Sequence, residues 1–222
     1  MLFDDNIFRN SLGQSNNEQW WNARKGRMTS SNFRAIATAS TPGAIRRCVS
    51  NIVNPREMAR LPAPMRLGLR EEGNAKRAYE DYMARQGRKV YVQDCGICVS
   101  NVHSFLATSP DGLVIAENGE RWLIEVKCIY DVKAIPRTIK AVAKDRGSKF
   151  YCKFEGDSLV LKKTHAYYSQ ILGQMAITGI LHVDFVIFAP RTGEVYVIPV
   201  DFCQRDWDEL FSKLVKFKEE HI

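Results

Sequence analysis

The chain has 222 residues, of which 45% are hydrophobic, 26% charged and 10% aromatic, and its formal net charge is +7 at pH 7. This composition excludes collagen-like, disordered and miniature disulfide-rich proteins, and a chain of this length can bury enough apolar surface for one domain. The surplus of positive charge favours a polyanionic partner, nucleic acid or an anionic membrane face, although a solvated basic surface gives the same number.

The first part of the chain has helical spacing. Ser30 or Ser31 can cap a short helix, and Pro42 suits the first turn of the next one. Residues 65–86 then form a longer amphipathic pattern that ends near Gly87. The sequence therefore predicts three helices before residue 88.

From Lys89 the hydrophobic period changes to two, which is typical of strands. The run 122–128 is apolar almost throughout and predicts a strand buried on both faces. Gly112 and the pair Asn118-Gly119 are expected to supply turns. Shorter strands are expected around Val90 and Val92, Ile97 and Val99, and Phe105 and Ala107.

The rest of the chain predicts a helix over 164–180, strands over 183–188 and 194–200, and a closing helix over 206–221. Helices, strands, helix, strands and helix in that order predict a mixed α/β fold with a central sheet. No linker or repeat divides the chain, so we expect one domain over 1–222, with its core at about 20–200 and a C-terminal helix at 203–222.

No membrane span is expected, because the longest apolar region, 171–190, is interrupted by Gln174, His182 and Asp184. The acidic start of the chain is unlike a signal peptide, so an intracellular protein is expected, in a bacterial cytoplasm or a eukaryotic nucleus. Its six cysteines are then better interpreted as buried thiols than as disulfides. Cys95-x-x-Cys98 has no second cysteine pair at metal-site spacing, which favours core cysteines over a metal site.

The most informative residues lie between Ser109 and Cys128. Asp111 sits in a Ser-Pro-Asp-Gly turn, and Glu125 and Lys127 alternate in the strand that follows, so both project from one face. Two carboxylates and the backbone carbonyl of Val126 are hard oxygen ligands suited to Mg²⁺ or Mn²⁺, and a lysine can orient a water toward a phosphorus atom. A simple Glu–Lys ion pair at a strand end is the competing interpretation.

This Pro-Asp…Glu-x-Lys pattern resembles the PD-(D/E)XK nuclease superfamily, and specifically its phage lambda exonuclease or YqaJ-like viral recombinase branch. The resemblance covers roughly residues 20–200. It implies a restriction-endonuclease-like α/β core, a central mixed β-sheet flanked by helices. The motifs that carry it, in order, are Trp20-x-x-x-Arg24-x-Gly26-x-x-Thr29-Ser30-Ser31, Gly68-x-x-x-Glu72-x-x-Ala75, Ser109-Pro-Asp-Gly112, Ile124-Glu-Val-Lys-Cys128 and Ala166-Tyr-Tyr-Ser-Gln170.

The resemblance also implies a role for each residue at the metal site. Asp111, Glu125, Glu72 and the Val126 carbonyl would hold Mg²⁺, with Mn²⁺ as a substitute and two ions expected. Lys127 would orient the attacking water, and Gln170 would support the nucleophile side. Two alternatives remain: Glu72 could be a surface charge in an acid-rich segment, and Gln170 could hydrogen-bond only within the fold.

At the DNA end, Arg24 and Ser31 would hold a terminal 5′-phosphate. Ser30 competes with Ser31 for this role, Ser31 could be only a helix cap, and Lys25 and Arg27 are rivals of Arg24. Downstream, a basic stripe could follow a phosphate backbone or be a solvated helix face. It contains Lys133, Arg137, Lys140 and Lys144, which share one face if residues 133–144 are helical.

The activity implied by the resemblance is Mg²⁺-dependent, two-metal digestion of linear double-stranded DNA from its ends, 5′ to 3′, leaving 3′ single strands for recombination. A single-strand annealing protein is the implied partner. Phage members of the branch form trimers, so a homo-oligomer is an option that the sequence leaves open. Two alternatives also remain: a nuclease of the same fold that cuts internally or cleaves RNA, and a non-catalytic nucleic-acid-binding module.

Overall fold

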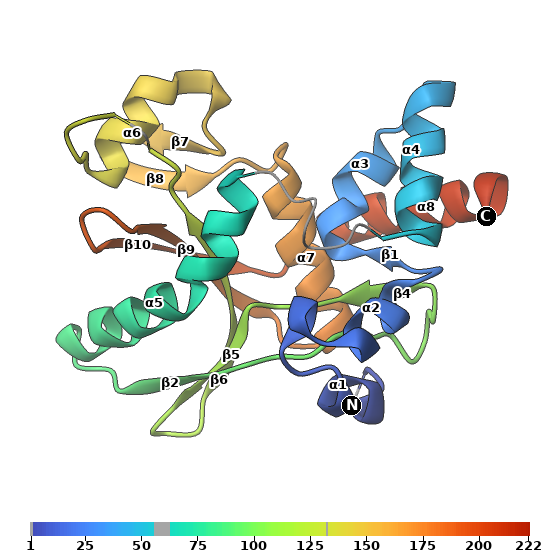
Figure 1. Cartoon of the computed structure of the whole chain (residues 1–222), viewed down its shortest axis with the longest axis horizontal. Coiled ribbons are helices and arrows are strands. Elements are labelled where there is room, and N and C mark those ends of the chain that lie inside the picture. The colour runs from blue at the N-terminus through green and yellow to red at the C-terminus, as the bar shows by residue number, and fades with distance from the viewer. Residues whose placement is uncertain (1, 56–62, 132) are drawn as a thin grey trace.

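The computed structural model describes residues 2–55, 63–131 and 133–222. Its largest sheet is mixed and has the strand order β10-β9-β6-β5-β2. Only the β6–β9 pair is parallel, and the other neighbours in this sheet are antiparallel. Figure 1 shows this sheet between helices, which confirms the expected mixed α/β fold. The strands are β2 (Val90–Gln93), β5 (Gly112–Ala116), β6 (Arg121–Cys128), β9 (His182–Ala189) and β10 (Glu194–Asp201).

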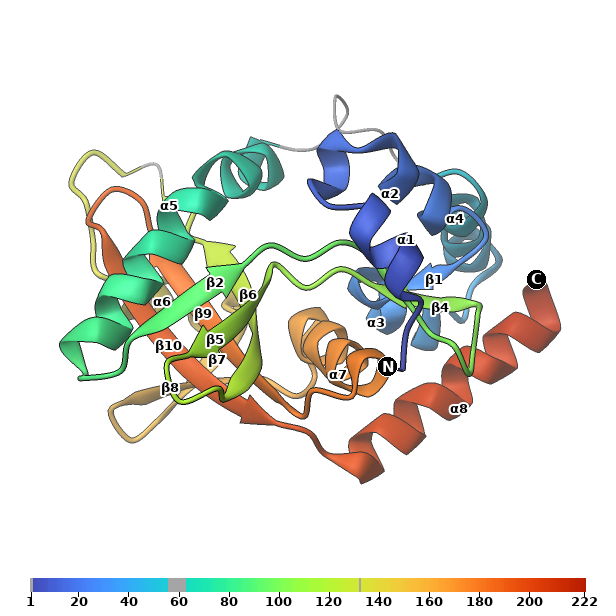
Figure 2. The same cartoon turned by 90° about the horizontal axis from the view of Figure 1, so that it is seen from below.

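Two helices cover opposite faces of the large sheet, α5 (Ala63–Arg85) and α7 (Ala166–Thr178) (Figure 2). α5 packs Ala75 and Tyr79 into one apolar cluster with Ile124 and its neighbours. α7 packs Ile171 and further residues into the main cluster on the other face. Strand β6 is thus buried on both sides, as its unbroken apolar run predicts.

A smaller sheet forms beside the N-terminal helices, with the order β1-β4-β3. Its strands are β1 (Met28–Thr29), β3 (Cys98–Val99) and β4 (Leu106–Thr108). The helical segments next to it are α1 (Asp5–Asn10), η1 (Gln14–Asn16), α2 (Glu18–Arg24) and η2 (Ser30–Asn32). Only Ser109, Pro110 and Asp111 separate β4 in the small sheet from β5 in the large one, and we call these three residues the connector.

Three further helices are α3 (Phe33–Ala37), α4 (Pro42–Val53) and α8 (Gln204–His221). Thr41 caps α4 by accepting a hydrogen bond from the Ala44 N–H, with Pro42 in the first turn as expected. α8 buries Leu210, Leu214 and Phe217, a stripe at helical spacing. These helices lie on the side of the molecule away from α6, β7 and β8 in Figure 1.

The segment between β6 and α7 differs from its expected form. It contains α6 (Ile139–Arg146), η4 (Gly147–Lys149) and the hairpin of β7 (Cys152–Glu155) and β8 (Ser158–Leu161). Lys133 and Arg137 precede α6, so residues 133–144 are not one helix and the face that such a helix would give does not form. Thr138 starts the helix later, because its side chain caps the Ala141 N–H.

Gly112 opens strand β5, so the turn expected at this residue is wrong. A Cβ atom at this position would lie 2.5 Å from Cγ1 of Val92 and 3.1 Å from Cγ2 of Ile124. Glycine is therefore needed there for close packing between β2 and β6. The turn expected at Asn118-Gly119 is confirmed, with Gly119 at φ +85° between β5 and β6.

Two broader expectations can be compared directly with the fold. No helix within the described residues is long and apolar enough to cross a membrane. The six cysteines, all within the described part of the chain, are free thiols, and Cys48, Cys95, Cys98 and Cys152 are buried. The interpretation of the cysteines as mainly buried thiols is confirmed.

Candidate active site

Strand β6 supplies Glu125 and Lys127 to the face that α7 covers. Glu125 is fully buried and accepts three side-chain hydrogen bonds. The Lys127 ammonium donates to Oε1 at 2.5 Å, Gln170 Nε2 donates to Oε1 at 2.6 Å, and Gln174 Nε2 donates to Oε2 at 2.6 Å. The expected common face of Glu125 and Lys127 is thus present, and α7 closes it with two amides one turn apart.

Asp111, at the end of the connector, lies against the same strand. Its Oδ2 accepts a hydrogen bond from the Val126 N–H at 2.7 Å. Burial, together with the negative charges of Glu125 and Glu72, raises the pKa of the Asp111 carboxyl well above its usual value. Three acids therefore repel one another at this point, and a cation near Asp111 would relieve the repulsion.

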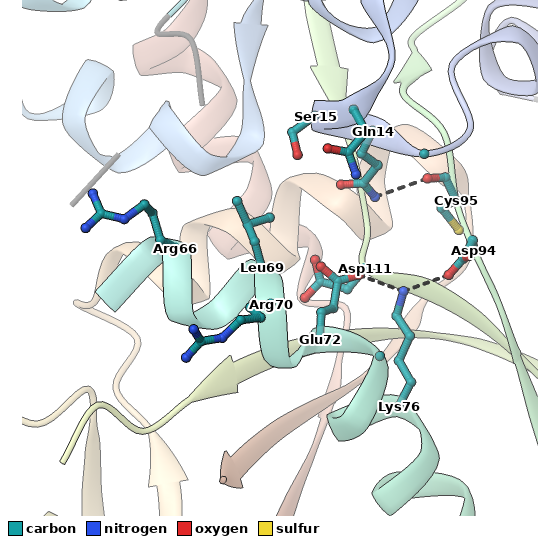
Figure 3. Close-up of a pocket in the computed structure, with 13 residues that line it drawn as sticks. Gln14, Ser15, Arg66, Leu69, Arg70, Glu72, Lys76, Asp94, Cys95 and Asp111 are labelled. Atoms are coloured by element: carbon teal, nitrogen blue, oxygen red, sulfur yellow. Dashed lines mark hydrogen bonds and ion pairs between the residues drawn. The ribbon is translucent and has the colours of Figure 1, made fainter. Parts of the chain in front are cut away.

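Glu72 approaches from α5, on a half-buried part of that helix. It forms an ion pair of 2.7 Å with Lys76, one turn further on, and Lys76 also contacts Asp94 at 2.8 Å (Figure 3). Burial opposes the charge of Lys76, but attraction to Glu72 and Asp94 outweighs it and raises the pKa of the lysine. The surface-charge interpretation of Glu72 does not fit this arrangement, because its partner Lys76 is only 12% exposed.

A cavity of about 550 Å³ opens beside Glu72 and Asp111. α5 forms one wall, and the η1 segment with the residues after β2 forms the other (Figure 3). Arg66, Leu69 and Arg70 line the α5 side. Gln14, Ser15, Asp94 and Cys95 are among the residues opposite.

The donor chemistry at this cavity fits a hard divalent cation, since Glu72, Asp94 and Asp111 line it and carboxylates are groups that Mg²⁺ and Mn²⁺ prefer. Within residues 2–55, 63–131 and 133–222, no group of three His, Cys, Asp or Glu side chains is already arranged to hold a metal ion. Two lysines instead pair with the acids: Lys76 with Glu72 and Lys127 with Glu125. Burial opposes the charge of Lys127 too, but Glu125 and Asp111 raise its pKa, so it stays protonated.

Arg24 lies at the end of α2 and does not line this cavity; we call Arg24, its partners Trp20 and Thr29, and the neighbouring Ser31 the Arg24 pocket. The Arg24 guanidinium stacks on Trp20, 4.2 Å from the ring centroid, and its NH2 group donates to Thr29 Oγ1 at 3.2 Å. Its buried Nε has no partner among the described residues. Burial lowers the pKa of Arg24 to about 10. A buried, unsatisfied guanidinium donor fits an anionic ligand such as a phosphate.

The two serines near Arg24 differ in their contacts. Ser30 is 3% exposed, and its hydroxyl pairs with Thr108 Oγ1 at 2.6 Å. Ser31 is exposed, and its hydroxyl lies 3.4 Å from Thr29 Oγ1, the same atom that accepts the hydrogen bond from Arg24. Of the two hydroxyls, only that of Ser31 is both exposed and close to the group that Arg24 contacts. The expected cap at Ser30 or Ser31 is wrong, because Thr29 holds the N-cap position of η2 and Asn32 that of α3.

The expected basic stripe is not brought to this site. Arg137 donates two hydrogen bonds to Asp131, at 3.0 and 2.9 Å, and pairs with Asp145 at 3.1 Å. Lys133 also pairs with Asp145, at 3.2 Å, and Lys140 pairs with Asp157, at 3.2 Å. Hydrogen bonding to Arg137 lowers the pKa of Asp131 to about 2. These cations have acidic partners within their own segment.

Two residues of the site, Lys76 and Gln174, are absent from the sequence-based prediction. Each follows a predicted residue by four positions on a helix, Glu72 in the first case and Gln170 in the second, so each shares its partner's face. This helical spacing is the sequence signal that could have identified Lys76 and Gln174. It was hard to see because Gln174 lies in an apolar run where a polar side chain resembles a surface position.

Comparison with solved structures gives the same fold at low sequence identity. An alkaline exonuclease (LHK-Exo) from Laribacter hongkongensis is 22% identical, with a TM-score of 0.64 and 91% of each chain covered. The Shutoff and Exonuclease Protein from Kaposi's sarcoma-associated herpesvirus is 14% identical, with a TM-score of 0.61, covering 97% of this chain and 71% of that one. A KSHV SOX RNA complex is 14% identical, with a TM-score of 0.60 and coverage of 96% and 72%. At these identities the likeness shows the fold alone.

The sequence itself gives the family. No curated protein matches it. The model of the YqaJ-like viral recombinase domain matches residues 19–181, well over half of the 222 residues, and confirms the resemblance seen in the motifs. This chain belongs to the YqaJ-like viral recombinase domain family.

Proposed function

We propose that the protein is a Mg²⁺-dependent DNA exonuclease that hydrolyses phosphodiester bonds at the ends of linear double-stranded DNA. One observation carries the proposal. In a chain of this family, Glu125 is buried against Lys127 and Gln170. Asp111 accepts a hydrogen bond from the backbone of the same strand, at Val126, and lines one cavity together with Glu72. Mutually repelling acids gathered beside a cavity are typical of functional sites.

Asp111, Glu125, Glu72 and the Val126 carbonyl would hold the metal, and we expect two ions. When bound, Mg²⁺ would supply Lewis-acid activation of water and charge stabilisation at the phosphate. Lys127, held protonated against Glu125, orients the attacking water through its remaining N–H donors. Gln170 fixes the direction of the Glu125 carboxylate.

The Arg24 pocket supports recognition of a DNA end. A 5′-phosphate there would satisfy the unpaired Nε donor of Arg24, with Ser31 as a second contact. Anchoring the 5′ end favours digestion in the 5′ to 3′ direction, which leaves a 3′ single-stranded tail. Such a tail is the substrate that a single-strand annealing protein would use in recombination.

Time-resolved digestion of a duplex labelled at either 5′ end or either 3′ end, with Mg²⁺ and with EDTA, tests activity, polarity and metal dependence together. We expect Glu125→Ala and Lys127→Ala each to abolish Mg²⁺-dependent digestion while duplex binding is retained. Glu71→Ala, which removes a neighbouring acid of α5, is the matched control and should remain active. Undiminished digestion by the Glu125→Ala/Lys127→Ala double variant would reject the site.

An RNA-cleaving or internally cutting nuclease is the second candidate, because a protein of the same fold is known in a KSHV SOX RNA complex. Covalently closed circular DNA and a structured RNA distinguish the two activities. An end-dependent DNA exonuclease leaves both intact under conditions that digest the linear duplex. Cleavage of either at a comparable rate would establish the second candidate.

A further inference from the structure

Three consecutive residues that lead to Asp111 each contact a side chain of the N-terminal region. Ser30 Oγ lies 2.6 Å from Thr108 Oγ1. Trp20 Nε1 donates to Ser109 Oγ at 2.8 Å, and Gln14 Nε2 donates to the Pro110 carbonyl at 2.8 Å. All three bonds join residues more than seventy positions apart in the sequence. The approach to Asp111 is therefore held from outside the large sheet.

One of these contacts comes from a side chain that Arg24 also touches, and a strand pairing links a second partner of Arg24 to β4. Trp20, which binds Ser109, is the ring on which the Arg24 guanidinium stacks. Thr29, which accepts a hydrogen bond from Arg24, lies in β1 and is in register with Ala107 of β4. The Arg24 pocket and the strand that leads to Asp111 are thus parts of one packed unit.

The connector can pass a displacement from this unit to Asp111. Pro110 fixes its own φ and restricts the conformation of Ser109. Gly112, on the other side, has no room even for a Cβ atom beside Val92. With a single residue between Ser109 and Asp111 and little conformational freedom around it, a shift at Ser109 must reach the Asp111 carboxylate.

We propose that Trp20 and Ser109 are positioning residues that couple occupancy of the Arg24 pocket by a terminal 5′-phosphate to the placement of Asp111. This rests on the proposed function, from which it takes the phosphate site and the catalytic use of Asp111. A phosphate that satisfies the free Nε of Arg24 draws the guanidinium toward it. The stacked Trp20 ring then moves with Arg24 and carries Ser109 through its N–H bond. The enzyme thereby cleaves faster at ends with the 5′-phosphate than at ends without it.

The test compares kcat and KM on duplexes with 5′-phosphate and 5′-hydroxyl ends for four proteins: wild type, Ser109→Ala, Arg24→Ala and the double variant. We expect Ser109→Ala to lower the kcat ratio of phosphate to hydroxyl ends about fivefold, the effect of one hydrogen bond. The KM for the phosphorylated duplex should stay within about twofold, because the bond acts on placement and leaves the phosphate contacts in place. Arg24→Ala should then reduce kcat less in the Ser109→Ala background than in wild type.

Two further variants separate coupling from folding. Trp20→Phe keeps a ring under Arg24 but removes the N–H donor, so it should lower the kcat ratio as Ser109→Ala does. Tyr196→Phe removes another long-range side-chain hydrogen bond, to the Leu159 N–H at 2.8 Å, and should leave the ratio unchanged. Melting curves verify that each variant is folded at the assay temperature.

The outcomes for the pocket and for the coupling are distinct. If the wild type digests both kinds of end with the same kcat, the phosphate role of Arg24 fails and the coupling fails with it. The coupling is overturned if the wild type prefers phosphorylated ends while Ser109→Ala and Trp20→Phe keep the wild-type ratio of kcat between the two kinds of end. In that case the effects of Arg24→Ala and Ser109→Ala on kcat simply multiply in the double variant, and the proposed function stands.

Discussion

Glu125 has no contact with solvent, yet three donors, Lys127, Gln170 and Gln174, point at its two oxygens. Charge-assisted hydrogen bonds of this kind fix the orientation of a buried carboxylate. Gln174 is the least exposed of the donors, and its own carbonyl oxygen, Oε1, has no partner within the described residues. Its main contribution is therefore the bond to Glu125 Oε2.

We expect Gln174→Met, which has a similar size and no N–H donor, to weaken binding of Mg²⁺ or Mn²⁺ about tenfold, because supporting contacts to metal ligands have effects of this order. Isothermal titration calorimetry measures the affinity without relying on turnover. Thr178→Val, which removes a buried polar group of another kind, a hydroxyl, from the same helix, is the control and should leave the affinity unchanged. Equal losses in both variants would show that Gln174 only packs the core.

At the residue scale, the sequence predicts the acids and the lysine of the candidate site, and the structure brings Asp111, Glu125, Lys127, Gln170 and Glu72 to one region. It does not predict which atoms pair. Lys76 could not be assigned to Glu72 and Asp94 together, because the contact with Asp94 depends on where β2 ends relative to α5. A lysine four residues after a glutamate is common on exposed helices and carries little information by itself.

Among the elements, β6 was the easiest to predict and β5 the hardest. The run 122–128 is apolar on both faces, whereas Gly112–Ala116 directly follows a Ser-Pro-Asp-Gly sequence that has the composition of a turn. The hairpin of β7 and β8 escaped prediction for a different reason. Its strands have four residues each and carry charged, exposed positions in β7, so their apolar alternation is too short to see.

The ion pairs of the segment before and within α6 favour a structural role over DNA contact for Arg137. We expect Arg137→Gln to lower the Tm, because Asp131 and Asp145 lose their shared partner, and to leave the Kd for duplex DNA within about twofold. Lys144→Gln makes the same change of charge on α6 and serves as the comparison. Filter binding across a salt series measures the Kd of both variants, and melting curves measure the Tm. If this segment instead follows the phosphate backbone, each variant weakens binding and lowers the salt slope by about one unit.

At the scale of the whole molecule, the large sheet is also held by a buried polar network at the end remote from Lys127. Asp184 accepts hydrogen bonds from Tyr79 at 2.5 Å and from Trp122 at 2.9 Å, so it joins α5 to β6 and β9. His182 lies beside it, with its ring nitrogens 3.4 Å from Asp184 and 2.6 Å from Asp201. Hydrogen bonding to Asp184 and Asp201 raises the pKa of His182 to about 9, although burial opposes this.

This network makes the stability of the fold depend on pH. The pKa of His182 is raised above the value of about 6.5 for an unfolded chain, so its stabilising contribution is complete below that pH and is lost as the pH rises toward 9. We expect the Tm of the wild type to fall over this interval more steeply than that of His182→Asn. Parallel slopes for the two proteins in melting curves taken from pH 6 to 10 would contradict this assignment.

The two lysines of the candidate site have a consequence for assembly of the enzyme in the cell. Lys76 and Lys127 already oppose the charges of Glu72 and Glu125, so the repulsion among the acids is partly offset within the polypeptide itself. A zinc finger, in contrast, depends on its ion to fold at all. Under the proposed Mg²⁺-dependent function, the chain would accordingly mature as a folded, dormant protein whatever the supply of divalent ions, and the ion would serve as a trigger for activity and not as a scaffold.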